Sequence, residues 1–173
     1  IGAWCCDDNQ RMIKAYRLLD KETRNQFLPD GGYTQYSFNY QRFTLQLFEC
    51  IYKISEKTGI FISDESRELI KNSTLLMYQS QDITGDVPNY GSNDGAHIFP
   101  LAECDYRDFR PALNTIYALT TGKRLYNEGI YDEELLWFGG NKEYPIAEIE
   151  RISSAYRTTG FYTLRHAGGF LMT

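Results

Sequence analysis

The chain has few of the residues that bind transition metals. Its 173 residues include only two histidines, and its four cysteines form no Cys-x-x-Cys pair. Zinc sites are built from several such ligands, often in closely spaced pairs. We therefore expect neither a metal ion nor any other cofactor.

Positive charge and long apolar runs are also scarce. The chain has 18 Lys and Arg against 23 Asp and Glu, for a net charge of −5. Nucleic-acid-binding proteins present a basic surface to phosphates, so no nucleic-acid partner is expected. No segment is apolar over the length needed to cross a bilayer, so no membrane partner is expected either. An acidic chain can still bind an acidic glycan where its arginines gather.

Aromatic residues, by contrast, are abundant: they make up 15% of the chain and include 14 Tyr and 10 Phe. The length allows one domain with a sizeable core. Tyrosines can fill such a core, but they also line sugar-binding clefts, where a flat apolar face and a hydroxyl are both useful. The composition is typical of a soluble globular protein.

Most of the chain has the apolar spacing of helices. Ser37 is expected to cap the second helix, because its hydroxyl can accept a bond from a free N–H at the helix start. Gly59 and Gly122 are expected at helix ends, and Asp132 is expected to cap the last helix. The predicted helices cover residues 8–27, 37–57, 63–80, 111–121 and 132–138.

After Asn141 the apolar period changes to that of strands. Residues 146–152 and 161–165 are predicted strands, and Gly168-Gly169 is a predicted hairpin turn into residues 170–173. Helices followed by strands indicate a mainly α chain with an α+β or two-domain organisation.

One stretch combines a flexible turn with the start of a long helix. Asp30-Gly31-Gly32 can adopt positive φ and allow close approach of a ligand. Tyr40 follows in the first turn of the predicted helix, which suits either a core aromatic or a catalytic phenol whose pKa the helix N-terminus lowers. The apolar stripe expected to face the core is Tyr40, Phe43, Thr44, Leu47, Phe48, Ile51 and Ile54.

Residues 81–105 form a long polar loop, and loops of this length are commonly functional or mobile. Asn93 and Asp94 lie between glycines in this loop, so they can bind sugar hydroxyls or hold an Asx turn. Asp86 and Asp94 lack the alternating pattern of a calcium loop.

Three segments, in this order, resemble heparinase II/III-like polysaccharide lyases. The first is Asp30-Gly31-Gly32 followed by Gln35-x-Ser37-x-x-Tyr40-x-Arg42. The second is the loop at 88–95 with the segment at 105–111, and the third lies at 159–165. The resemblance implies part of an α/α toroid of antiparallel helix pairs over residues 1–143. The first strands of an antiparallel β-sandwich would then follow over residues 144–173.

The resemblance also implies cleavage of a uronic-acid-containing glycan by β-elimination, with Tyr40 as catalytic acid or base. Arg42 lies about 200° around the helix from Tyr40, which favours a structural ion pair over a substrate contact. The family's carboxylate-neutralising Asn or His and its catalytic His have no matching position, and His97 and His166 do not match. The candidate substrate-binding residues are Tyr33, Gln35, Tyr36, Arg42, Asn93 and Asp94.

If the resemblance holds, the chain is an internal piece of a longer protein, for which the family favours a periplasmic or secreted location. We then expect the piece to be inactive alone and to self-associate through exposed inner faces and an unpaired strand edge. Two alternatives are a glycoside hydrolase on a similar toroid, using Asp30 and Asp94 as its carboxylate pair, and a glycan-binding module without catalysis.

Overall fold

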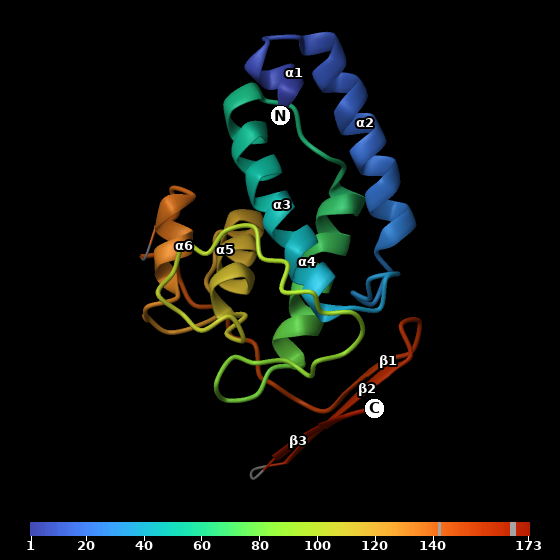
Figure 1. Ribbon diagram of the computed structural model, residues 1–173, viewed down its shortest axis with the longest axis vertical. Coiled ribbons are helices and arrows are strands. Elements are labelled where there is room, and N and C mark those ends of the chain that lie inside the picture. The colour runs from blue at the N-terminus through green and yellow to red at the C-terminus, as the bar shows by residue number, and fades with distance from the viewer. Residues whose placement is uncertain (142, 167–168) are drawn as a thin grey trace.

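The computed structural model describes residues 1–141, 143–166 and 169–173. It is mainly helical, with a small antiparallel sheet near the C-terminus (Figure 1), so the predicted fold class is confirmed at this coarse level. The elements are α1 (Gly2–Cys5), α2 (Asn9–Gln26), α3 (Phe38–Thr58), α4 (Asp64–Gln79), α5 (Arg110–Thr121), α6 (Asp132–Trp137), β1 (Ser154–Tyr156), β2 (Phe161–His166) and β3 (Gly169–Met172).

Local capping signals place the helix ends well. The Ser37 hydroxyl accepts a bond from Tyr40 N at 3.1 Å, as predicted for the start of α3. Gly59 ends α3 with φ of 71°, and Gly122 ends α5 with φ of 69°. Only glycine adopts this left-handed conformation without strain, so both ends follow from the sequence.

Asp132 does not cap α6, contrary to the prediction. It is the first residue of the helix, and its buried carboxylate accepts bonds from Asn114 Nδ2 at 2.8 Å and Gly129 N at 3.0 Å. It also pairs with Arg124 at 3.3 Å. The carboxylate thus joins α5, α6 and the loop between them, because donors from all three are available inside.

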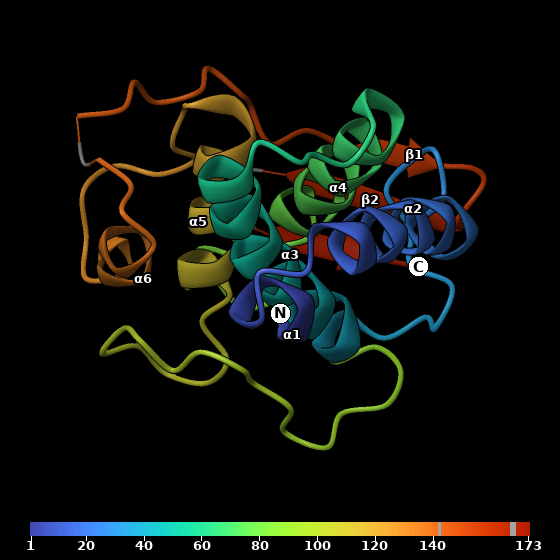
Figure 2. The ribbon, with the colours of Figure 1, turned by 90° about the horizontal axis from the view of Figure 1, so that it is seen from above.

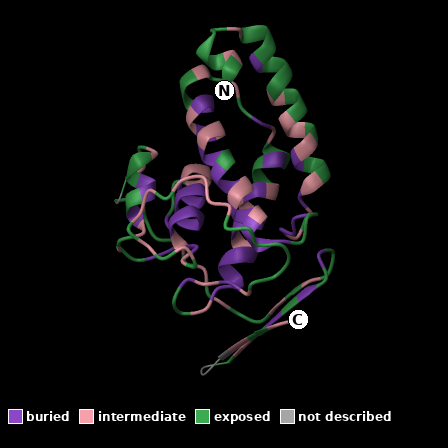
Figure 3. Ribbon diagram, viewed as in Figure 1, coloured by how far each residue is buried: buried purple, intermediate pink, exposed green. Residues whose placement is uncertain are grey.

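Helix α3 lies at the centre of the helical part. Figure 1 shows α3 running antiparallel to α2 and α4, and Figure 2 shows α5 and α6 beyond its other side. The densest burial falls on α3, α4 and α5, whereas α1 and α2 are largely exposed (Figure 3). The fully buried apolar side chains at this centre include Leu45, Ile70, Leu76, Leu113 and Ile116.

The buried face of α3 differs from the predicted stripe. Leu47 is 40% exposed, while Arg42, Gln46 and Glu49 are buried. Because several elements surround α3, polar positions beside the apolar stripe are covered as well. Glu49 faces Glu134 of α6, and burial beside this second carboxyl raises the pKa of Glu49 well above its ordinary value.

Residues 146–152 do not form the predicted strand of a sheet. Ile146 makes only an isolated parallel bridge with Arg124, and the backbone of the residues that follow is held by side chains from the end of α4. Gln79 donates to Glu150 O at 2.8 Å and accepts from Ile152 N at 3.0 Å, and the Tyr78 hydroxyl donates to Ile149 O at 3.1 Å. Residues 146–152 therefore have the alternating pattern of a strand, but they contact the end of α4 instead of a neighbouring strand.

The sheet has the order β1-β2-β3 with antiparallel pairing throughout. The predicted strand at 161–165 is confirmed as β2, and β3 begins at Gly169. Gly168, half of the predicted hairpin turn, lies outside the described residues. The division at residues 143 and 144 stays a prediction. Within the described residues, no helix has the length and apolar character to span a bilayer.

Candidate functional site

The hydroxyl of Tyr40 meets the polar loop at the N-terminal end of α3. It donates to Asp94 Oδ2 at 2.5 Å, and the neighbouring Asn39 Nδ2 lies 3.3 Å from Asp94 Oδ1. Tyr106 adds a second phenol, whose oxygen lies 2.6 Å from Oδ1 of both Asn39 and Asn93. We call Asn39, Tyr40, Asn93, Asp94 and Tyr106 the Tyr40 cluster.

Backbone contacts hold the loop against α3. The Ser37 hydroxyl donates to Ser92 O at 2.5 Å, and Phe38 N donates to Tyr90 O at 3.3 Å. A Cβ at Gly91 would lie 1.9 Å from Tyr36 O, so only glycine allows this approach. The loop therefore presents Asn93 and Asp94 at the helix start.

Electrostatics keep the proton on Tyr40. The bond to Asp94 raises the pKa of Tyr40, with smaller contributions from desolvation and from the Asp94 charge. The same bond lowers the pKa of Asp94. The expected lowering by the helix N-terminus is therefore wrong, because the adjacent carboxylate outweighs it. At neutral pH the pair is a phenol donating to a carboxylate.

Arg42 is buried behind the cluster. It is 1% exposed, and its guanidinium carbon is 4.5 Å from the ring centroid of Tyr106 and 4.2 Å from that of Phe109. It donates to Tyr106 O at 2.6 Å and to Asn39 Oδ1 at 3.3 Å. These partners are carbonyl oxygens, so the expected ion pair is not seen among the described residues, and the substrate contact stays a prediction. Arg42 orients Asn39 and Tyr106.

The remaining predicted substrate-binding residues lie apart from the cluster or at its edge. Tyr33 is 5% exposed and packs on Phe27, so it belongs to the core. Tyr36 is 41% exposed and contacts Phe161 edge to face, and Gln35 is exposed. The structure thus brings Asn93 and Asp94 to Tyr40 but does not bring Tyr33 there.

The two glycines after Asp30 serve a contact within the protein. Asp30 accepts bonds from Thr158 N at 2.7 Å, Thr159 N at 3.0 Å and the Thr159 hydroxyl at 2.6 Å. A Cβ at Gly32 would lie 2.0 Å from Thr159 Oγ1, and one at Gly31 would lie 2.3 Å from Asn72 O. The close approach predicted for a ligand is made instead by the β1–β2 turn and α4.

Sequence reasoning missed Asn39 and Tyr106 in the cluster, and it set aside His97, which lies beside the cluster. His97 is half-buried and lies edge-on to Tyr106, with ring centroids 6.2 Å apart. Burial and the charge of Arg42 lower the pKa of His97 to about 4, so its imidazole is neutral at pH 7. Tyr106 belongs to a segment already singled out, but only the folded chain places it beside Asn39.

The described residues hold no group of three or more His, Cys, Asp or Glu side chains that would suit a metal ion. No family model, curated protein or solved structure matches this chain. The resemblance to heparinase II/III-like lyases therefore rests on the sequence segments alone.

Proposed function

We propose that this protein is part of a polysaccharide lyase that cleaves a uronic-acid-containing glycan by β-elimination, with Tyr40 in the acid role. The observation that carries the proposal is the Tyr40 hydroxyl, held at 2.5 Å from Asp94 by a loop that belongs to a second lyase-like segment. Two segments that resemble one family thus meet at one hydroxyl.

The reaction needs a proton donor for the departing glycosidic oxygen. A base removes the proton on C5, the C4–C5 double bond forms, and O4 leaves with a proton. Tyr40 carries its proton at neutral pH because of its raised pKa, which suits proton donation to O4. Asn39 and Tyr40 both direct donors at one carboxylate, that of Asp94, and adjacent donors of this kind also suit an acidic sugar.

The finer architecture belongs to the same proposal. The antiparallel arrangement of α2, α3 and α4 supports reading them as part of an α/α toroid. The sheet β1-β2-β3 then represents the first strands of a β-sandwich domain. The proposal also includes a boundary between the two parts at residues 143 and 144. It further includes the inactivity of the piece alone and its self-association.

The hydrolase alternative finds little support in the geometry. Asp30 is committed to Thr158 and Thr159, and the pKa of Asp30 is lowered by those hydrogen bonds despite an opposing effect of burial. The pKa of Asp94 is lowered too. A glycosidase needs one carboxylic acid with a raised pKa, and neither residue provides it.

The test uses the full-length protein and a panel of uronic-acid polysaccharides. β-Elimination leaves an unsaturated product, which is followed by its ultraviolet absorbance. Tyr40→Phe is expected to lower the rate by about a hundredfold or more, since a positioned acid contributes on that order. Tyr162→Phe is the matched control, because Tyr162 is 45% exposed on the sheet.

Each other outcome identifies a rival. Absorbance that grows equally in Tyr40→Phe would keep the lyase and remove Tyr40 from the chemistry. New reducing ends without absorbance would identify a hydrolase. Binding without any product, unchanged in Tyr40→Phe, would identify a glycan-binding module.

A further inference from the structure

A cleft lies away from the Tyr40 cluster. It is open to solvent, has a volume of about 720 Å³ and is bounded by the end of α4, the start of α5, the loop before α6 and residues 146–151. Its volume falls within the range of about 300–1,000 Å³ that is usual for small-molecule sites. We call it the tyrosine–arginine cleft after Tyr78, Arg110, Tyr126, Tyr131 and Arg151.

Tyrosines form a continuous wall of this cleft. The ring centroids of Tyr78 and Tyr126 are 5.6 Å apart, and those of Tyr126 and Tyr131 are 5.5 Å apart. Tyr131 donates its hydroxyl to Asn127 O at 2.6 Å, which holds the ring in place. Tyr78 and Tyr126 are each 8% exposed, so the half-buried Tyr131 offers most of the wall's ring surface to a flat, polar ligand.

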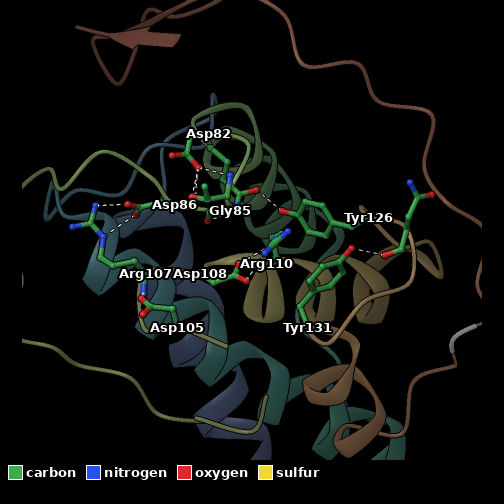
Figure 4. A network of polar contacts seen from close by, with 12 residues as sticks. Asp82, Gly85, Asp86, Asp105, Arg107, Asp108, Arg110, Tyr126 and Tyr131 are labelled. Carbon is green, nitrogen blue, oxygen red and sulfur yellow. Dashed lines mark hydrogen bonds and ion pairs between the residues drawn. The ribbon is translucent and has the colours of Figure 1, made fainter. Parts of the chain in front are cut away.

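The two arginines of the cleft differ in how their charge is met. Arg110 forms a two-pronged ion pair with Asp108, at 2.9 Å and 2.7 Å, and stacks on Tyr131 with its guanidinium carbon 4.7 Å from the ring centroid. Figure 4 shows Tyr131 beside this pair. The charge of Arg110 is therefore largely neutralised by its carboxylate partner.

Arg151 has no such carboxylate partner. It stacks on Tyr78, with its guanidinium carbon 4.6 Å from the ring centroid, and donates to Asp82 O at 3.0 Å and Gln81 Oε1 at 3.3 Å. Both acceptors are uncharged, and no ion pair to Arg151 occurs within the described part of the chain. These two bonds use only part of the guanidinium's set of N–H donors. The cleft thus holds a fixed cation with donors to spare.

We propose that the tyrosine–arginine cleft binds a carboxylate-bearing sugar unit of a glycan, with Arg151 pairing with the carboxylate and the tyrosines contacting the ring. An arginine fixed by uncharged partners retains its attraction for an anion. Glu148 and Glu150 are exposed residues of the lining that alternate with the less exposed Ala147, Ile149 and Arg151. Their charges disfavour a densely charged ligand such as a polyphosphate more than a ligand with one carboxylate per sugar unit. That the ligand is a sugar rests on the proposed function.

Ile83 permits a test that leaves the fold intact. It lines the cleft and is 94% exposed, so a charge placed there disturbs no packing. The measurement is calorimetric binding of glucuronate, galacturonate and mannuronate oligosaccharides to the full-length protein carrying Tyr40→Phe, which is expected to slow turnover. At low salt, Ile83→Lys should bind roughly threefold more tightly than Ile83→Gln, and Ile83→Glu roughly threefold more weakly. Neutral galactose oligosaccharides should bind weakly and equally to all three.

Arg151→Gln provides the larger effect, an expected loss of tenfold or more in affinity, with thermal unfolding as the check on folding. The inference is overturned if no uronate oligosaccharide distinguishes Ile83→Lys from Ile83→Glu, or if neutral oligosaccharides bind as tightly. Charge-dependent binding in a protein without lyase activity would refute the proposed function and keep this site. Lyase activity together with charge-independent binding would support the proposed function and overturn this site.

Discussion

The Tyr40 cluster and the tyrosine–arginine cleft handle charge in opposite ways. In the cluster a carboxylate, Asp94, is met by the neutral donors Tyr40 and Asn39. In the cleft a guanidinium, Arg151, is met by neutral acceptors. The first arrangement keeps a proton on a phenol, and the second keeps a positive charge available to an anion. The neutral partners of a charge thus decide what each site offers to a ligand.

One short segment serves both regions. Tyr106 reaches Asn39 and Asn93 in the cluster, whereas Arg110, four residues later, lines the cleft. Between them Phe109 covers the guanidinium of Arg42. A change on one side of this segment should therefore leave the other side measurable, which allows the two regions to be tested separately.

The largest effect is expected from a substitution that disrupts the Tyr40 cluster and leaves the tyrosine–arginine cleft intact. Arg42→Ala removes a buried side chain, leaves Tyr106 O without its donor and leaves Asn39 Oδ1 with the Tyr106 hydroxyl as its remaining donor. We expect a loss of about 3 kcal/mol in the free energy of unfolding, measured with denaturant.

Arg11→Ala is the control for Arg42→Ala, because the Arg11 side chain is 82% exposed. It should cost less than about 0.5 kcal/mol. Equal effects of the two substitutions would contradict a structural role for Arg42. If Arg42→Ala stays folded, lyase activity should fall while binding of uronate oligosaccharides to the cleft persists.

A second prediction concerns the carboxyl pair near Arg42. Burial raises the pKa of Glu134 to about 7, so the folded state holds a proton that the unfolded state releases near its ordinary pKa of about 4.3. The stability contributed by this proton is present at low pH and is lost as pH rises toward 7.

Glu134→Gln should therefore weaken this pH dependence. The free energy of unfolding is measured with denaturant between about pH 5 and about pH 8. In this range the carboxylates with a lowered pKa stay ionised, so they add no pH dependence of their own. The variant is expected to lose less stability than the wild type over that window. Parallel curves for the two proteins would show that Glu134 does not hold the proton.

The smallest expected effect concerns the hydrogen bond between Tyr40 and Asp94 in the Tyr40 cluster. Asp94→Asn removes the main cause of the raised pKa of Tyr40, so that pKa should fall toward about 10. Carbon NMR titration of labelled tyrosines measures it, with Tyr40→Phe identifying the signal. An unchanged pKa would mean that Asp94 is not the partner of Tyr40 in solution.

Residues near one another in the chain determined much of this fold. The caps at Ser37 and Gly59 and the strand at 161–165 were predicted because each depends on a few neighbouring positions. The local setting of Asn93 and Asp94 makes them candidates, whereas the catalytic role predicted for Tyr40 comes from the resemblance. Their hydrogen bonding and the place of Asn39 and Tyr106 could not be predicted in this way.

Only the tertiary structure decided where polar side chains find their partners. Asp132 turned inward to Asn114, residues 146–152 were bound by Tyr78 and Gln79, and Arg42 was covered by Phe109. A helix period or a cap is satisfied within one or two turns, so the sequence shows it directly. A buried charge takes whichever donor or acceptor the folded chain brings to it from distant positions, and no local pattern records that choice.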